Sequence, residues 1–101
     1  EPILKRALLI SRKVNGEISP LTATVYSNLA LIYSALYLKE KAIEFNKLSF
    51  EIRKQVYGEN HYRTNISRNN LATSYLANQE FNKAEKLLKA VLLQNKNLYG
   101  I

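Results

Sequence analysis

The residues of this chain that could do chemistry are few. His61 is the only histidine, cysteine and aspartate are absent, and the chain contains only three glycines. A Ser-His-Asp triad, a zinc site with three or four ligands, or a glycine-rich phosphate loop would each need residues that are missing here. We therefore expect no enzyme activity, no metal, no cofactor and no small-molecule substrate. His61 is expected to form hydrogen bonds at the start of a helix, and Glu40 with Glu44 to balance nearby lysines.

Asn28 and Asn70 are the polar residues with the most informative spacing. An amide side chain has both donors and an acceptor, so it can bind a peptide backbone whatever its sequence. Asparagine is a poor residue for a helix interior and needs a reason to be there. The two hypotheses are a ladder of amides that binds a peptide, and amides that bond to a neighbouring helix. Arg63 and Arg68 either clamp a carboxylate or lie on a solvated surface.

The elements that position these side chains form an internal repeat. Gly16, Gly58 and Gly100 are separated by steps of 42 residues. Sliding the chain by this offset gives about 17 identities in 59 pairs, against about four for random matching, which is typical of a repeat protein. Among the matched segments are Asn28-Leu29-Ala30 with Asn70-Leu71-Ala72, and Lys41-Ala42 with Lys83-Ala84.

Apolar residues recur at steps of three or four, which predicts helices throughout and no strand. Ser19-Pro20 is a helix start signal, and Gly58 and Gly100 are stop signals. The predicted helices cover residues 2–14, about 20–36, 39–57, 62–77 and 80–99, with short turns at Tyr37-Leu38 and Asn78-Gln79. The inward positions include Leu21, Val25, Leu29, Leu36, Ala42, Phe45, Leu48, Ile52, Val56, Ile66, Leu71, Leu76 and Phe81.

Composition indicates a folded domain with a basic surface. Apolar residues make up 47% of the chain, and the formal net charge is +7. The longest apolar run, residues 29–38, is too short to cross a bilayer, so no membrane insertion is expected. The absence of cysteine fits a cytoplasmic (intracellular) location. Because the chain begins with Glu1 rather than Met, we expect it to be part of a longer protein.

These residues resemble the tetratricopeptide repeat family, in the 42-residue class that looks like kinesin light chain repeats. The segments that carry the resemblance are Asn28-Leu29-Ala30 with Tyr33, Asn70-Leu71-Ala72 with Tyr75, residues 1–8, and the loop Gly58-Glu59-Asn60-His61. The family usually has a glycine in the turn within each helix pair, where this chain has Tyr37 and Gln79.

The resemblance implies an all-α, right-handed superhelix (α-solenoid) of antiparallel helix pairs, about five helices in total. Residues 1–16 would end a preceding unit, residues 17–58 would form the first full unit, and residues 59–100 the second. The first helix of each pair would line a concave groove that binds a protein or an extended peptide. The candidate groove residues are Thr24, Ser27, Asn28, Leu31, Arg63, Ile66, Arg68, Asn69, Asn70 and Thr73.

Two other functions stay open from the sequence. The net positive charge suggests nucleic-acid binding, and the repeat alone suggests an architectural spacer within a longer array. Because such arrays generally need about three units for stability, we also expect self-association through exposed array ends.

Overall fold

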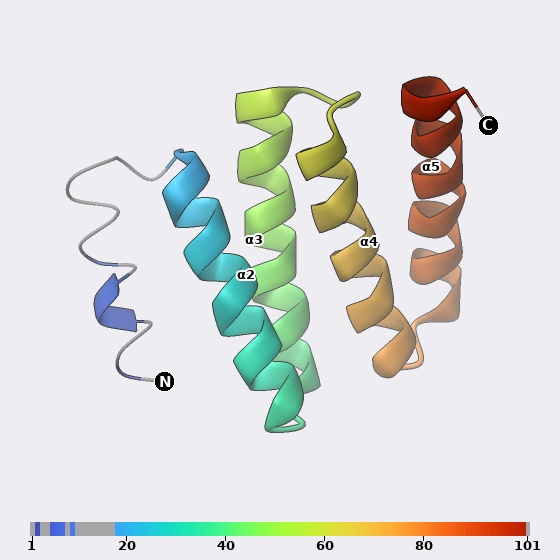
Figure 1. The fold of residues 1–101 in the computed structure, drawn as a ribbon. Helices are drawn as coiled ribbons and strands as arrows, with labels where there is room; N and C mark the ends of the chain where they lie inside the picture. The colour runs from blue at the N-terminus through green and yellow to red at the C-terminus, as the bar shows by residue number, and fades with distance from the viewer. Residues whose placement is uncertain (1, 3–4, 8, 10–17, 101) are drawn as a thin grey trace.

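The predicted helices after residue 18 are all present. The computed structural model describes residues 2, 5–7, 9 and 18–100, and Figure 1 shows the helices α2 (Pro20–Ala35), α3 (Lys39–Tyr57), α4 (Tyr62–Ala77) and α5 (Phe81–Tyr99). No strand occurs in these residues, and residues 2, 5–7 and 9 are also helical. The all-α prediction is therefore confirmed. The rest of the helix predicted over residues 2–14 lies outside the described residues.

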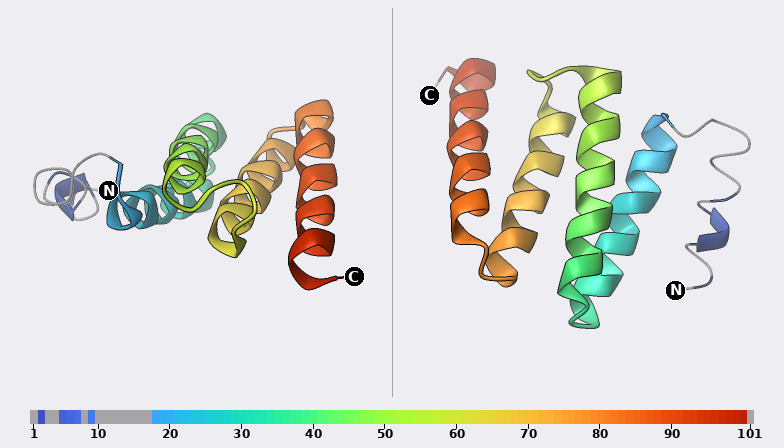
Figure 2. Two further views of the ribbon diagram at one scale, coloured as in Figure 1. Left: turned by 90° about the horizontal axis from the view of Figure 1, so that it is seen from above. Right: turned by 180° about the vertical axis from the view of Figure 1, so that it is seen from behind.

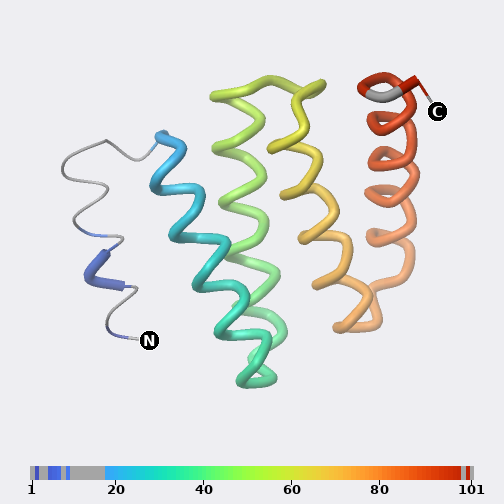
Figure 3. Tube along the Cα trace, in the orientation of Figure 1, coloured from blue at the N-terminus to red at the C-terminus, as the bar shows by residue number. Residues whose placement is uncertain are grey.

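The helices form an open stack. Each helix packs against the next one along the chain and runs antiparallel to it, as the ribbon and the Cα trace show (Figures 1 and 3). Viewed from above, successive helices are offset from a single plane (Figure 2). The principal extents are 39 × 29 × 15 Å, which is too thin for a closed bundle around a central core. This arrangement is the predicted α-solenoid.

The hydrogen bonds in the two turns within the helix pairs repeat at the 42-residue offset. Leu38 N donates to Tyr33 O at 2.8 Å, and Glu80 N donates to Tyr75 O at 2.9 Å. Each of these bonds spans five residues and closes a helix in the manner of a Schellman motif. The repeat seen in the sequence is therefore a repeat of backbone geometry.

Non-glycine residues hold the left-handed position in both turns. Tyr37 has a φ of 61° and Gln79 a φ of 62°, and among the described non-glycine residues no others have a positive φ. These are the two positions at which the family usually has glycine. A residue with a Cβ can adopt this conformation only at a conformational cost, so each turn carries local strain.

The helix start and stop signals are confirmed, with one difference in geometry. Ser19 caps α2 through its Oγ, which accepts from Thr22 N at 3.1 Å, and Pro20 occupies the first turn. Gly100 is left-handed, with φ 72° and ψ 19°, as predicted for a helix stop. Gly58 differs, because its φ of 88° and ψ of 171° place it in a region open essentially to glycine alone.

Alanines bring the paired helices together. Ala30, Ala42, Ala72 and Ala84 are each at most 2% exposed. Beside them the Phe45 ring stacks on those of Tyr26 and Tyr33, with ring centroids 5.6 and 5.4 Å apart. These four alanines correspond in pairs at the 42-residue offset, and larger side chains there would overpack the interior.

Several residues predicted to face inward are exposed instead. They lie at helix ends or on helix faces that no neighbouring helix covers, because each helix of an open stack buries only the faces that contact its neighbours. These residues are Leu21, Leu36, Leu48, Val56, Ile66, Leu76 and Phe81.

Candidate peptide-binding groove

A depression of about 360 Å³ lies between α2 and α4, with α3 at its floor. We call it the α2–α4 groove. None of its lining residues is charged; they are small, apolar, hydroxyl or amide residues: Ser27, Asn28, Ala30, Leu31, Ser34, Asn46, Asn70, Thr73, Ser74 and Ala77. Five of the ten predicted groove residues are among them, namely Ser27, Asn28, Leu31, Asn70 and Thr73.

Asn28 of α2 and Asn70 of α4 both line this groove. The two residues occupy equivalent places in the repeat, so the 42-residue offset puts both amides in one groove. Within the described part of the chain, neither side chain makes a hydrogen bond to another residue. The structure therefore does not support the hypothesis that these two amides bond to a neighbouring helix.

Sequence reasoning missed Asn46, which lies at the floor of the groove. Its Nδ2 donates to the backbone oxygen of Asn70 at 3.4 Å. Asn46 belongs to α3, a second helix of a pair, which the resemblance assigned to the convex face. The signal was present nevertheless, because an asparagine in the middle of a helix needs a reason to be there at this position as well.

Three of the four hydroxyl groups that line the groove are already bonded to the protein. Thr73 Oγ1 donates to Asn69 O at 3.0 Å, and Ser74 Oγ donates to Leu71 O at 2.7 Å. Ser27 Oγ lies 2.7 Å from Ser49 Oγ, which belongs to a buried polar chain beneath the groove.

That buried chain joins three helices. Ser49 Oγ donates to Ala23 O at 2.9 Å and lies 3.4 Å from Ser67 Oγ, which accepts from Arg53 Nη1 at 2.9 Å. Ser49 and Ser67 are at most 1% exposed. Burial lowers the pKa of the Arg53 guanidinium; Tyr57 opposes that effect and Arg63 adds to it. An arginine remains charged at neutral pH even so, and its charge is bonded to a hydroxyl.

A second depression of about 290 Å³ lies between α4 and α5. We call it the α4–α5 recess, and its lining residues are Tyr62, Asn65, Ile66, Asn69, Val91 and Asn95. Two of the predicted groove residues, Ile66 and Asn69, lie here rather than in the α2–α4 groove. The reason is that α4 has a different neighbour on each side, which a helical projection does not distinguish.

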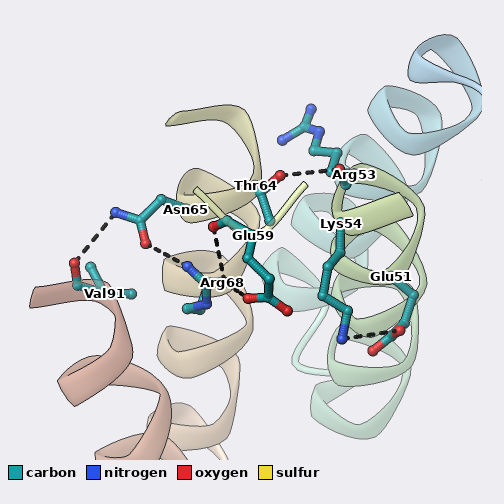
Figure 4. Close-up of polar contacts among 8 residues, drawn as sticks. All are labelled: Glu51, Arg53, Lys54, Glu59, Thr64, Asn65, Arg68 and Val91. Carbon is teal, nitrogen blue, oxygen red and sulfur yellow. Dashed lines mark hydrogen bonds and ion pairs between the residues drawn. The ribbon is translucent and has the colours of Figure 1, made fainter. Parts of the chain in front are cut away.

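Arg68 is neither a ligand clamp nor a solvated surface residue, so both expectations are wrong for it. It is 3% exposed, and its guanidinium donates to Glu59 Oε2 at 2.7 Å and to Asn65 Oδ1 at 3.0 Å (Figure 4). It also lies 5.2 Å from the centre of the Phe50 ring. These contacts use its guanidinium within the protein, so Arg68 is not available to clamp a ligand.

Asn65 extends this network to α5. Its Nδ2 donates to Asn95 Oδ1 at 2.8 Å and to Val91 O at 3.4 Å, the second contact being drawn in Figure 4. The loop before α4, α4 itself and α5 are thus joined by one line of polar side chains. Such a line fixes the register of the helix pair.

Arg63 and Thr24 lie outside both depressions. Arg63 is exposed, and its guanidinium lies over the rings of Tyr57 and Tyr62, at 5.8 and 5.3 Å from their centres. Thr24 is exposed and its hydroxyl donates to Pro20 O at 3.1 Å.

His61 has the local role that was predicted. Its Nδ1 accepts from Arg63 N at 3.0 Å and caps α4, while its ring stacks on those of Tyr57 and Tyr62. In the part of the chain that the structure describes, no three His, Cys, Asp or Glu residues come together as metal ligands would. No helix in that part is long and apolar enough to cross a bilayer.

Antiparallel helix pairs that repeat at 42 residues and leave a groove between them define a helical-repeat protein. A model of the tetratricopeptide repeat family matches residues 22–63 and again residues 66–100, which is more than half of the chain. The chain therefore belongs to the tetratricopeptide repeat family, in the 42-residue class similar to kinesin light chain repeats. No match was found among curated proteins. The assignment of residues 17–58 and 59–100 as the two units stays a prediction.

Proposed function

We propose that this protein is an interaction module that binds an extended peptide segment of a partner protein in the α2–α4 groove. Tetratricopeptide repeats are in general non-enzymatic modules for protein–protein interaction. The observation that carries the proposal is the pair of amides, Asn28 and Asn70, which line one groove and have no hydrogen bond within the described residues. An intracellular location stays part of this proposal.

The chemistry of the groove suits a polypeptide backbone. A peptide backbone presents N–H and C=O groups, and one carboxamide can bond to both kinds. Leu31, beside Asn28, is 70% exposed and offers apolar surface to a side chain of the same peptide. Because the helices are already folded, they lose little conformational entropy on binding.

The cationic residues do not favour the nucleic-acid alternative. None of them lines the α2–α4 groove. Arg68 is buried and ion-paired with Glu59. Three of the lysines each lie near a glutamate on their own helix or at its start, namely Lys54, Lys83 and Lys89. An extended phosphate backbone would need a continuous cationic groove.

The double variant Asn28→Ala with Asn70→Ala tests the proposal. Phage-displayed random 12-residue peptides are selected on the wild-type protein, and the affinities of the recovered peptides are measured. We expect an affinity about 5- to 150-fold weaker for the variant, because two lost bonds at about 0.5–1.5 kcal/mol each sum to about 1–3 kcal/mol.

The matched control is Asn82→Ala with Asn97→Ala, which removes two exposed asparagines on α5 and should leave the affinity unchanged. Circular dichroism checks that both variants fold. Equal binding by wild type and the groove variant would refute the groove assignment and leave the spacer function.

A further inference from the structure

We infer that the α2–α4 groove selects an uncharged stretch of its partner and rejects carboxylates and phosphates, despite the net charge of +7. The inference rests on the proposed function and deepens it by naming the chemical class of the ligand. It follows from where the hydroxyl protons of the groove point and from where the cations lie.

The direction of each hydroxyl bond in the wall can be assigned. A backbone oxygen only accepts, so Thr73 and Ser74 use their single protons on Asn69 O and Leu71 O. Ser49 likewise uses its proton on Ala23 O. The contact between Ser27 and Ser49 therefore requires Ser27 to donate.

Three of the four hydroxyls that line the groove thus present only lone pairs to a ligand. They can accept from an N–H or O–H group but cannot donate to an oxygen anion. The side-chain N–H donors of the lining come from asparagine amides, and one of those of Asn46 is used on Asn70 O. The donors that remain for a ligand are therefore neutral ones, namely asparagine N–H groups and the Ser34 hydroxyl.

An anion in this groove would have no cation to compensate it. The lining contains no lysine, arginine or histidine. Moving a carboxylate from water to a site without an opposite charge costs free energy, because neutral donors replace its hydration only in part. A neutral backbone with small amide, hydroxyl or apolar side chains has N–H groups for the hydroxyl oxygens and meets no such cost.

Long-range attraction does not alter this selection at physiological salt. The net positive charge attracts acidic peptides to the protein as a whole, but exposed charges are screened over about 8 Å at 0.15 M ionic strength. Binding in the groove must therefore be separated from binding elsewhere on the surface. Comparison of the wild type with the Asn28→Ala, Asn70→Ala variant makes this separation.

The experiment uses the 101-residue protein and the random 12-residue phage library in 0.15 M salt. Peptides are kept as groove-dependent only if the wild type binds them at least tenfold more tightly than the Asn28→Ala, Asn70→Ala variant. We expect these peptides to have at least a twofold lower content of Asp and Glu than the unselected library. Their affinities should change less than about twofold between 0.05 and 0.2 M salt, since no phosphate-like contact is involved.

Thr73→Lys supplies the missing cation and gives a second readout. We take a groove-dependent peptide and a copy of it that carries one added Glu. The substitution should raise the affinity for the copy at least fivefold more than it raises the affinity for the parent peptide. Thr24→Lys is the matched control, because Thr24 is also an exposed helical threonine bonded four residues back, and it lies outside the groove. It should produce no such change.

The outcomes separate the two proposals. Groove-dependent peptides that are enriched in Asp and Glu would overturn the ligand class and leave the groove function in place. An equal response of Thr73→Lys and Thr24→Lys would overturn the ligand class as well. A selection that yields no groove-dependent peptide would overturn both proposals.

Discussion

Arg63 and Arg68 lie on the same helix and have opposite environments. Arg63 is exposed above two aromatic rings, whereas Arg68 is 3% exposed between the Phe50 ring and the Glu59 carboxylate. Both have the same side chain and a similar place in the sequence pattern. Their roles differ because a glutamate in the preceding loop can reach one of them.

Arg68 should therefore matter for stability and Arg63 should not. Arg68→Ala leaves the buried Asn65 Oδ1 without its donor and opens space beside Phe50, so we expect a loss of about 2–3 kcal/mol in the free energy of unfolding. Arg63→Ala should change it by no more than about 0.5 kcal/mol. Urea unfolding measures both, and similar values for the two variants would contradict the burial argument.

Local signals mark where α2, α4 and α5 begin. Ser19 and His61 cap α2 and α4 at equivalent points of the repeat, although one is a hydroxyl and the other an imidazole. At the start of α5, the Asn78 amide and then Lys83 hold the pKa of Glu80 below its usual value of 4.5. The start of each of these helices is thus marked by contacts among residues a few positions apart.

The turn between α4 and α5 offers a prediction at the scale of the element. Gln79 is exposed with a φ of 62°, so Gln79→Gly should relieve its strain and raise the free energy of unfolding by about 0.5–1 kcal/mol. Gln55, exposed within α3, is the matched control. Gln55→Gly should lower stability by about 1 kcal/mol, since glycine is unfavourable inside a helix. Thermal melts of both variants measure the effect. If the two substitutions both raise or both lower the melting temperature, the strain argument is refuted.

The whole molecule is an open stack with an uncovered face on α5. Leu92 follows Phe50 by one repeat, yet Phe50 is 8% exposed beneath α4 and Leu92 is 69% exposed. Leu93 beside it is 56% exposed. Apolar surface of this kind favours association, so self-association through this end of the array stays a prediction.

Leu92→Glu tests that prediction. A charge at this position should abolish association without lowering stability, because the side chain is already exposed. Asn82→Glu places the same charge at an exposed position ten residues earlier on α5, about 15 Å along the helix, and should leave association intact. Sedimentation velocity over a concentration series gives the answer, and a wild-type chain that stays monomeric throughout would contradict it.

Most of the fold could be predicted from the sequence, but only part of the site. Apolar periodicity and the capping residues placed α3 and α4 at their observed bounds, and the repeat predicted that Asn28 and Asn70 would share a groove. It did not predict that Asn46 lies at the floor, or that Ile66 and Asn69 belong to the α4–α5 recess. A helical projection identifies a face of one helix, whereas a site depends on which two helices meet at that face.

The sequence by itself determined the helices, their turns and their repeat, because these depend on contacts among residues at most a few positions apart. Only the tertiary structure decided which polar groups remain for a ligand. It bonded Arg68 to Glu59 and directed the proton of Ser27 to Ser49, on another helix. The hydroxyl groups of the groove wall act as acceptors because such packing contacts use up the protons that the residue types alone would offer.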